Sequence, residues 1–145
     1  MIRIVVALQA EARPLVSHYR LKAVAGAFPL YQSEGLWLVV SGVGKTRAAA
    51  ATANLHAAAG EGPGCAWINV GIAGHRERPV GEAILADKIV DGASGRRWYP
   101  PRLPGVPPPS ASVLTVDHVE ERFTGDWVYE MEAAGICAAA SRLSA

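Results

Sequence analysis

Ser41-Gly42-Val43-Gly44-Lys45-Thr46 joins an apolar run at residues 36–41 to an alanine-rich stretch at residues 46–59. The apolar run is typical of a buried strand, and the alanine-rich stretch is typical of a helix. A glycine turn between a strand and a helix presents backbone N–H groups that can bind an anion or a polar ligand. This stretch therefore predicts an α/β fold with a binding site where the strand ends.

The rest of the chain alternates the same two signals. Helices are expected at residues 10–19, 46–59 and 131–143, and strands at 4–8, 28–32, 36–41, 65–70, 82–90 and 113–116. Residues 91–109 are rich in Gly, Pro and Arg and are expected to form an exposed loop, with an extended run at Pro107-Pro108-Pro109. Alternating helices and buried strands predict a largely parallel or mixed sheet, in a single domain covering residues 1–145.

Composition narrows the functional classes. The chain has 145 residues, half of them hydrophobic and 19% charged, with a net charge of +1, so a packed core is expected and a nucleic-acid partner is not. Cys65 and Cys137 lack metal-binding spacing and are expected to be buried thiols. The apolar N-terminus is too short for a membrane span and does not resemble a signal peptide. We therefore expect a cytoplasmic protein with no membrane contact, metal or cofactor.

Three predicted strand ends meet at one edge of the sheet. Glu11 follows the first strand, the Gly42/Gly44 turn follows the strand at 36–41, and Gly71-Ile72-Ala73-Gly74 follows the strand at 65–70. Ligands of open α/β sheets bind at the carboxyl ends of the strands. A nucleoside-triphosphate loop is excluded, because it requires a glycine where this chain has Val39. The glycines could also serve only for tight turns and close packing.

Glu130-Met131-Glu132-Ala133-Ala134-Gly135 is expected to open the last helix. A carboxylate in a first helical turn faces the positive end of the helix dipole, which favours its charged form. Such a fixed carboxylate can accept hydrogen bonds from a pair of sugar hydroxyls. The alternative is a surface helix that merely starts with acidic residues.

Five short motifs, taken together, resemble the purine nucleoside phosphorylase/nucleosidase superfamily. They are Ala7-Leu8-Gln9-Ala10-Glu11, Ser41-Gly42-Val43-Gly44-Lys45, Asn69-Val70-Gly71-Ile72-Ala73-Gly74, Val80-Gly81-Glu82 and Glu130-Met131-Glu132-Ala133. The chain looks closest to the methylthioadenosine/S-adenosylhomocysteine nucleosidase branch. The resemblance implies a three-layer α/β/α sandwich around a mixed, partly barrel-like sheet. It also implies cleavage of the N-glycosidic bond of a purine nucleoside or thionucleoside.

The resemblance assigns roles to matching residues. Glu11 falls on the glutamate that activates the attacking water, although by itself it could be a solvated helix residue. Glu132 falls on the glutamate that holds the ribose hydroxyls, and Met131 on the methionine that packs against the sugar. The remaining expected substrate contacts come from the glycine turns and from the loop after residue 116: Gly42, Ile72, Ala73, Gly74, Asp117 and His118.

One departure bears on catalysis. The family's base-protonating aspartate comes on a strand after the Met-Glu helix, whereas this sequence ends at Ala145. The expectation is a C-terminally truncated family fold without that acid. General acid catalysis is worth roughly 10²–10⁴-fold, so turnover would suffer. Asp117 is a conceivable substitute, although it matches no family position.

Alternatives therefore stay open at the sequence level. Hydrolysis is favoured over phosphorolysis, because Glu11 suits water and would repel phosphate, and no arginine near the turns matches a phosphate-binding motif. The chain is expected to be a nucleosidase, a nucleoside-binding protein with little turnover, or a small scaffolding or oligomerisation domain. A sheet edge left unpaired would also favour a homo-oligomer.

Overall fold

The computed structural model describes residues 1–60, 64–101, 105 and 109–143. The elements follow in this order: β1 (Ile2–Val6), α1 (Gln9–His18), β2 (Lys22–Val24), β3 (Leu30–Ser33), β4 (Leu36–Val40), α2 (Lys45–Ala59), β5 (Ala66–Asn69), β6 (Leu85–Asp91), β7 (Arg97–Trp98), β8 (Ser110–Thr115), β9 (Val128–Glu130) and α3 (Ala133–Leu143). Strands and helices alternate as the sequence predicts, and the fold is α/β.

The strands form two mixed sheets. The first has the order β2-β3-β4-β1-β5, in which β1 runs parallel to β4 and β5, while β2 and β3 are antiparallel neighbours. The second has the order β7-β6-β8-β9, in which β6, β8 and β9 are parallel. An antiparallel bridge between Gly74 and Tyr129 links the segment after β5 to β9. The two sheets are therefore joined by backbone hydrogen bonds.

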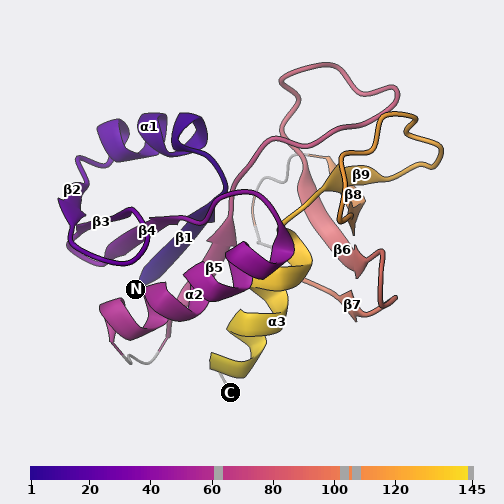
Figure 1. The fold of residues 1–145 in the computed structure, drawn as a ribbon. Coiled ribbons are helices and arrows are strands. Elements are labelled where there is room, and N and C mark those ends of the chain that lie inside the picture. Colours follow the sequence, from indigo (N-terminus) through magenta and orange to yellow (C-terminus); the bar gives the residue numbers. More distant parts are fainter. Residues whose placement is uncertain (61–63, 102–104, 106–108, 144–145) are drawn as a thin grey trace.

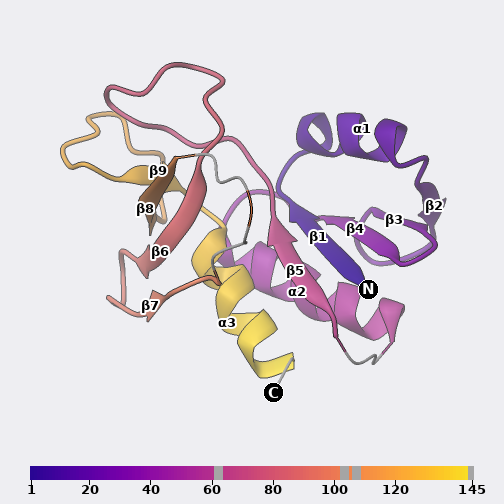
Figure 2. The same cartoon turned by 180° about the vertical axis from the view of Figure 1, so that it is seen from behind.

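Helices cover both faces of the first sheet, with α1 on one side and α2 and α3 on the other (Figures 1 and 2). Side chains of β1 alternate between these layers, because successive residues of a strand point to opposite faces. Ile4 and Val6 pack in the cluster that includes Ala12 of α1. Val5 packs instead with Leu55 of α2 and with Ile136 of α3. Burial on both faces explains why the strand reads as a continuous apolar run.

Several boundaries differ from the sequence-based expectation. The last helix begins at Ala133 rather than Met131, so the acidic motif ends β9 and precedes α3. β2, β7 and β9 were not expected, and β7 lies within the segment 91–109 that was predicted to be loop. Of the proline run, Pro107 and Pro108 lie outside the described residues, while the Pro109 carbonyl accepts a hydrogen bond from the Leu85 N–H.

Two further expectations concern the cysteines and the membrane. Cys65 and Cys137 are free thiols, and each is partly exposed rather than fully buried. Within the described part of the chain, no helix has both the length and the apolar character that crossing a bilayer requires.

Candidate active site at the carboxyl ends of the strands

Glu11 lies at the edge where β1, β4 and β5 end. One of its carboxylate oxygens, Oε2, accepts hydrogen bonds from the backbone N–H groups of Ala7 and Leu8, each at 2.9 Å. The other oxygen, Oε1, accepts from the Ile72 N–H at 2.9 Å. Glu11 is the third residue of α1, so these contacts cap the helix and also tie the end of β1 to the turn after β5. A carboxylate offers about four acceptor positions, so about one remains for a ligand or water.

Glu132 lies across the edge, between the starts of two helices. Its Oε1 accepts a hydrogen bond of 2.7 Å from the N–H of Gly44, the residue that precedes α2. Gly44 has φ = 103°, a conformation that glycine adopts readily and other residues rarely do. Within the described residues, Oε2 of Glu132 has no hydrogen-bond partner. This carboxylate therefore faces the positive end of α2.

Glu130 is the largely buried carboxylate of the motif. Its Oε2 accepts from the backbone N–H groups of Glu132 and Ala133, each at 2.7 Å, and its Oε1 accepts from the Thr115 hydroxyl. The same hydroxyl accepts from the Ala134 N–H at 3.0 Å. Burial raises the pKa of Glu130, and the neighbouring Glu132 charge adds to the rise, against the opposing effect of these hydrogen bonds.

Lys45 bridges the two sheets at the same edge. Its ammonium lies 2.8 Å from Asp91 Oδ1 at the end of β6 and 2.9 Å from Asp117 Oδ1 beyond β8. Hydrogen bonds to Asp91 and then Asp117 raise the pKa of Lys45. Burial alone would raise the pKa of Asp91, but the hydrogen bonds from Lys45, Ser94 and Ala93 together outweigh it and the pKa is lowered. One cation is thus shared by two carboxylates.

The chain was compared with known proteins. No protein-family model and no curated protein sequence matches it. Solved structures do match over nearly the whole chain. Methylthioadenosine/S-adenosylhomocysteine nucleosidase from Neisseria meningitidis, in complex with methylthio-immucillin-A, has a TM-score of 0.72 at 22% identity, covering 98% of this chain and 80% of its own.

Two other structures agree. The nucleosidase from Colwellia psychrerythraea, in complex with adenine, gives a TM-score of 0.74 at 22% identity, covering 98% of this chain and 76% of its own. A mutant futalosine hydrolase of Helicobacter pylori gives 0.70 at 14% identity, covering 97% and 83%. The chain has the nucleoside phosphorylase/nucleosidase fold. The α/β/α architecture expected from the motifs is thereby confirmed.

Other predicted site residues occupy the same edge of this nucleosidase fold. The Gly42 N–H donates to the Ala7 carbonyl at 3.0 Å, so the first glycine turn is fastened to the end of β1. Ile72 donates its N–H to Glu11 and leaves its side chain 78% exposed. Ala73 is exposed beside it, whereas Gly74 forms the bridge to Tyr129. The turn after β5 therefore contributes one hydrogen bond to Glu11 and one connection between the sheets.

Met131, Asp117 and His118 have different surroundings. Met131 is half-buried between the two glutamates of its motif. Asp117 is bound to Lys45, and His118 is exposed. Lys45, Asp91, Thr115 and Glu130 were not predicted as site residues. Lys45 and Glu130 lie inside quoted motifs, but the sequence gives no signal that Asp91 and Thr115 end neighbouring strands.

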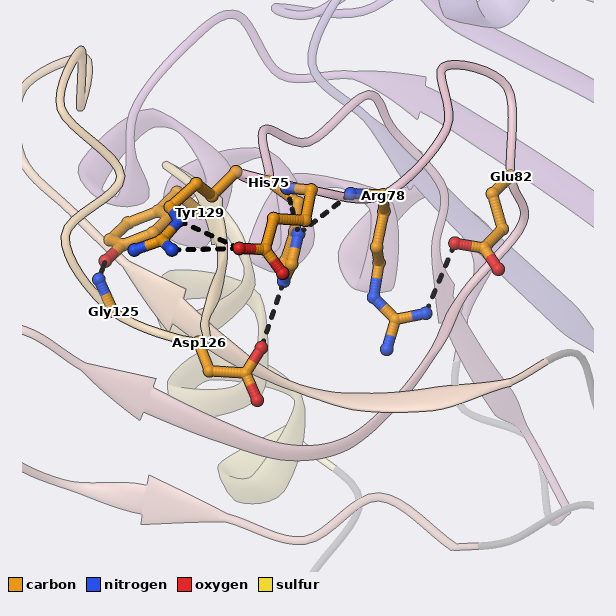
Figure 3. Close-up of polar contacts among 8 residues, drawn as sticks. His75, Arg78, Glu82, Gly125, Asp126 and Tyr129 are labelled. Atoms are coloured by element: carbon orange, nitrogen blue, oxygen red, sulfur yellow. Dashed lines mark hydrogen bonds and ion pairs between the residues drawn. The ribbon is translucent and has the colours of Figure 1, made fainter.

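The segment after Gly74 lies beside the loop before β9. The buried His75 ring is 3.2 Å from Asp126 through Nε2, and its Nδ1 accepts from the N–H groups of Glu77 and Arg78, as Figure 3 shows for Asp126 and Arg78. Because Nδ1 accepts two hydrogen bonds, it carries no proton itself. The ring N–H is therefore on Nε2, which donates to Asp126. Tyr129 accepts from the Gly125 N–H at its hydroxyl, 3.0 Å away (Figure 3). These contacts hold the two loops together next to the bridge.

The edge is bordered by exposed apolar side chains. Leu8 is 43% exposed, Val43 47% and Ile72 78%, and each lies two or three residues beyond the end of a strand. No group of three or more His, Cys, Asp or Glu side chains is placed to hold a metal ion in the described ranges. The edge thus combines fixed carboxylates with apolar surface.

Proposed function

We propose that this chain binds a purine nucleoside or thionucleoside at the carboxyl edge and hydrolyses its N-glycosidic bond. The observation that carries the proposal is that two carboxylates are each held by a backbone N–H group of a glycine turn. Glu11 is held by the Ile72 N–H of one glycine turn, and Glu132 is held by the Gly44 N–H of the other. The structures with this fold include nucleosidases in complex with a nucleoside analogue and with adenine, which supports a substrate of this class.

The two carboxylates suit different tasks. The Glu132 oxygen that has no hydrogen-bond partner among the described residues can accept from ribose hydroxyls, while the other oxygen stays on Gly44. Glu11 retains an acceptor position for a water molecule, from which it takes a proton as the water attacks the sugar. Glycoside cleavage passes through a positively charged, oxocarbenium-like transition state, which two nearby carboxylates stabilise. Leu8, Val43 and Ile72 offer apolar surface to a base or a thioether.

The electrostatics favour water over phosphate as the second substrate. Phosphorolysis needs a cationic cradle, usually with arginine or lysine free to bind the anion. Lys45 follows the glycine turn, but its charge is matched by Asp91 and Asp117. Glu11 and Glu132 add negative charge at the same edge. These two carboxylates would repel a phosphate anion.

Asp117 bears on turnover and favours a second candidate, a nucleoside-binding protein with little hydrolysis. A general acid must carry a proton that it can give to the leaving base. Asp117 instead accepts from the Lys45 ammonium at 2.9 Å, so its Oδ1 is already engaged in an ion pair. Recognition of the sugar does not need this proton, so binding persists in either candidate.

Adenine release from methylthioadenosine tests the hydrolase proposal, with binding measured in parallel by calorimetry. We expect Glu11→Gln to lower the rate by roughly 10²–10⁴-fold, because the amide cannot take a proton. Glu132→Gln should weaken binding of the nucleoside. Glu34→Gln, an exposed substitution in the β3–β4 turn, is the matched control and should change neither quantity.

The outcomes separate the two candidates. Binding of methylthioadenosine without adenine release would support the nucleoside-binding protein. Release that requires added phosphate would contradict hydrolysis. If neither methylthioadenosine nor adenine binds, nucleoside recognition itself is wrong.

A further inference from the structure

We propose that Thr115 and Glu130 form a positioning pair that sets Glu132 for the ribose. The inference rests on the proposed function and assigns two residues that were not predicted as site residues, although Glu130 lies inside a quoted motif. Neither side chain needs to touch the ligand. Each acts through the backbone of Glu132 and of the first residues of α3.

The pair is placed by strand register. Thr115 ends β8, Glu130 ends β9, and the two residues lie opposite each other in the parallel ladder. Thr115 is fully buried, and its hydroxyl donates to Glu130 Oε1 and accepts from the Ala134 N–H. A buried hydroxyl with both a donor and an acceptor contact has one orientation. The Glu130 carboxylate is consequently fixed from the side of β8.

The fixed carboxylate in turn fixes Glu132. Glu130 Oε2 takes the N–H groups of Glu132 and Ala133, each at 2.7 Å. With the Ala134 N–H on Thr115, three successive backbone donors at the start of α3 are satisfied by this pair. The backbone at Glu132 is therefore held in one conformation, from which its side chain reaches the Gly44 N–H. Thr115 and Glu130 therefore orient the second oxygen of Glu132 through the backbone.

An ordinary helix cap would not need this arrangement. A single short acceptor such as Ser, Thr, Asp or Asn before the helix normally serves. Here a largely buried glutamate stands next to a second carboxylate, and burial first and the Glu132 charge in addition raise the pKa of Glu130. Two like charges held together cost stability, and such costs concentrate at functional sites. Orienting Glu132 therefore explains this geometry better than a role in ending the strand alone does.

The test compares two ligands, methylthioadenosine and free adenine, because only the first carries ribose. Thr115→Val keeps the shape of the side chain and removes the hydroxyl. We expect it to weaken methylthioadenosine binding by roughly 10–100-fold, the range for lost hydrogen bonds to charged groups, with adenine binding unchanged. Thr115→Ser restores a hydroxyl and should recover nucleoside binding. Glu130→Gln should produce the same selective loss, since an amide cannot accept from three donors.

Glu132→Gln separates failure of this inference from failure of the proposed function. If the wild-type protein binds no nucleoside, or if Glu132→Gln leaves the ratio of nucleoside to adenine affinity unchanged, the proposed function is wrong. If Glu132→Gln alters that ratio but Thr115→Val and Glu130→Gln do not, the positioning pair is wrong. An equal loss for both ligands, or failure of Thr115→Ser to recover binding, overturns it as well. Should Thr115→Val not fold, Glu130→Gln measured against the unaltered protein gives the same comparison.

Discussion

At the scale of single residues, charge pairing at Lys45 holds the candidate site together. The ammonium contacts Asp91, which is largely buried, and Asp117, which is half exposed. The Asp91 contact is the stronger of the two, because a less solvated pair is less screened. Lys45 thus links the start of α2, beside Glu132, to the ends of β6 and β8.

This pairing has a defined pH window. The pKa of Lys45 is raised, so its contribution to stability is present below its ordinary value of 10.5 and is lost as pH rises through the higher folded value. The pKa of Asp91 is lowered, so its contribution is present above its ordinary value of 3.8 and is lost as pH falls through the lower folded value. Lys45→Gln should therefore reduce the free energy of unfolding by about 1 kcal/mol between roughly pH 4 and pH 10, with a smaller difference outside that range.

Urea unfolding of both proteins across that pH range measures the difference. Asp117→Asn is the matched control and should cost less than Lys45→Gln, since its partner contact is the more exposed one. A difference that does not change with pH would show that Lys45 acts through packing rather than charge.

Residue identity alone predicted part of the candidate site. Glu11 was expected at the edge, because it follows a strand signal and matches a family motif. Glu132 was expected as a sugar-binding carboxylate, because it matches a family motif at a predicted helix start. Their hydrogen-bond donors were not predictable, because Ile72 and Gly44 act through backbone N–H groups that a sequence does not distinguish. Asp117 was expected to contact the substrate, which stays a prediction, and its pairing with Lys45 was not foreseen.

At the scale of elements, Gly135 sets how closely α3 approaches α2. A Cβ atom at Gly135 would overlap the backbone carbonyl group of Lys45. Backbone atoms cannot rotate away as a side chain can, so the helices would have to separate. The first turns of both helices lie beside Glu132, so this approach also sets the width of the candidate site.

Gly135→Ala provides a test in which two effects have opposite signs. In a helix interior, alanine is ordinarily more favourable than glycine by about 1 kcal/mol. Overlap with the Lys45 carbonyl should instead make the variant less stable by about 1–3 kcal/mol, the range for overpacking. Thermal and urea unfolding measure the sign directly. A more stable variant would mean that the helices are free to move apart.

Elements were predicted best where burial is strongest. The apolar runs of β1 and β4 are buried inside the first sheet, so their hydrophobic signal is clear, whereas β5 was predicted from its apolar residues although it is the exposed edge strand. β2, β7 and β9 have two or three residues, which is too short for any periodic pattern. The acidic motif was assigned to a first helical turn, because acidic residues followed by small ones fit that position equally well. Pairing of β9 with β8 instead extends Glu130 into the sheet.

At the scale of the whole molecule, the candidate site lies where the two sheets meet. Glu11 belongs to the first sheet's edge, Glu130 ends the second, and Glu132 reaches from the second to Gly44 of the first. Self-association and a cytoplasmic location stay predictions. Because the site is assembled from both sheets, the two sheets must keep a fixed position relative to each other. This condition is met only if they fold as one unit.

Three kinds of contact predict that they do. The Gly74–Tyr129 bridge has hydrogen bonds of 2.9 and 2.8 Å, Lys45 pairs with two residues of the second sheet's edge, and α2 packs along α3. We therefore expect the amides of β1 and β8 to exchange hydrogen with the same opening free energy, through global unfolding. Native-state hydrogen exchange in low urea measures this for each strand.

Gly74→Ala should reduce that coupling. Its Cβ would lie 2.5 Å from the Phe123 ring, so the ring or the bridge must shift. We expect the β8 and β9 amides to exchange faster in this variant, while the β1 amides change less. The double variant Gly74→Ala/Phe123→Ala should relieve the overlap and restore equal protection of the two sheets. Because the overlap involves one ring and one backbone position, the two substitutions should be strongly non-additive. Lower protection of β8 than of β1 in the unaltered protein would instead mean that the second sheet opens by itself, and a site spanning both sheets would then be only transiently assembled.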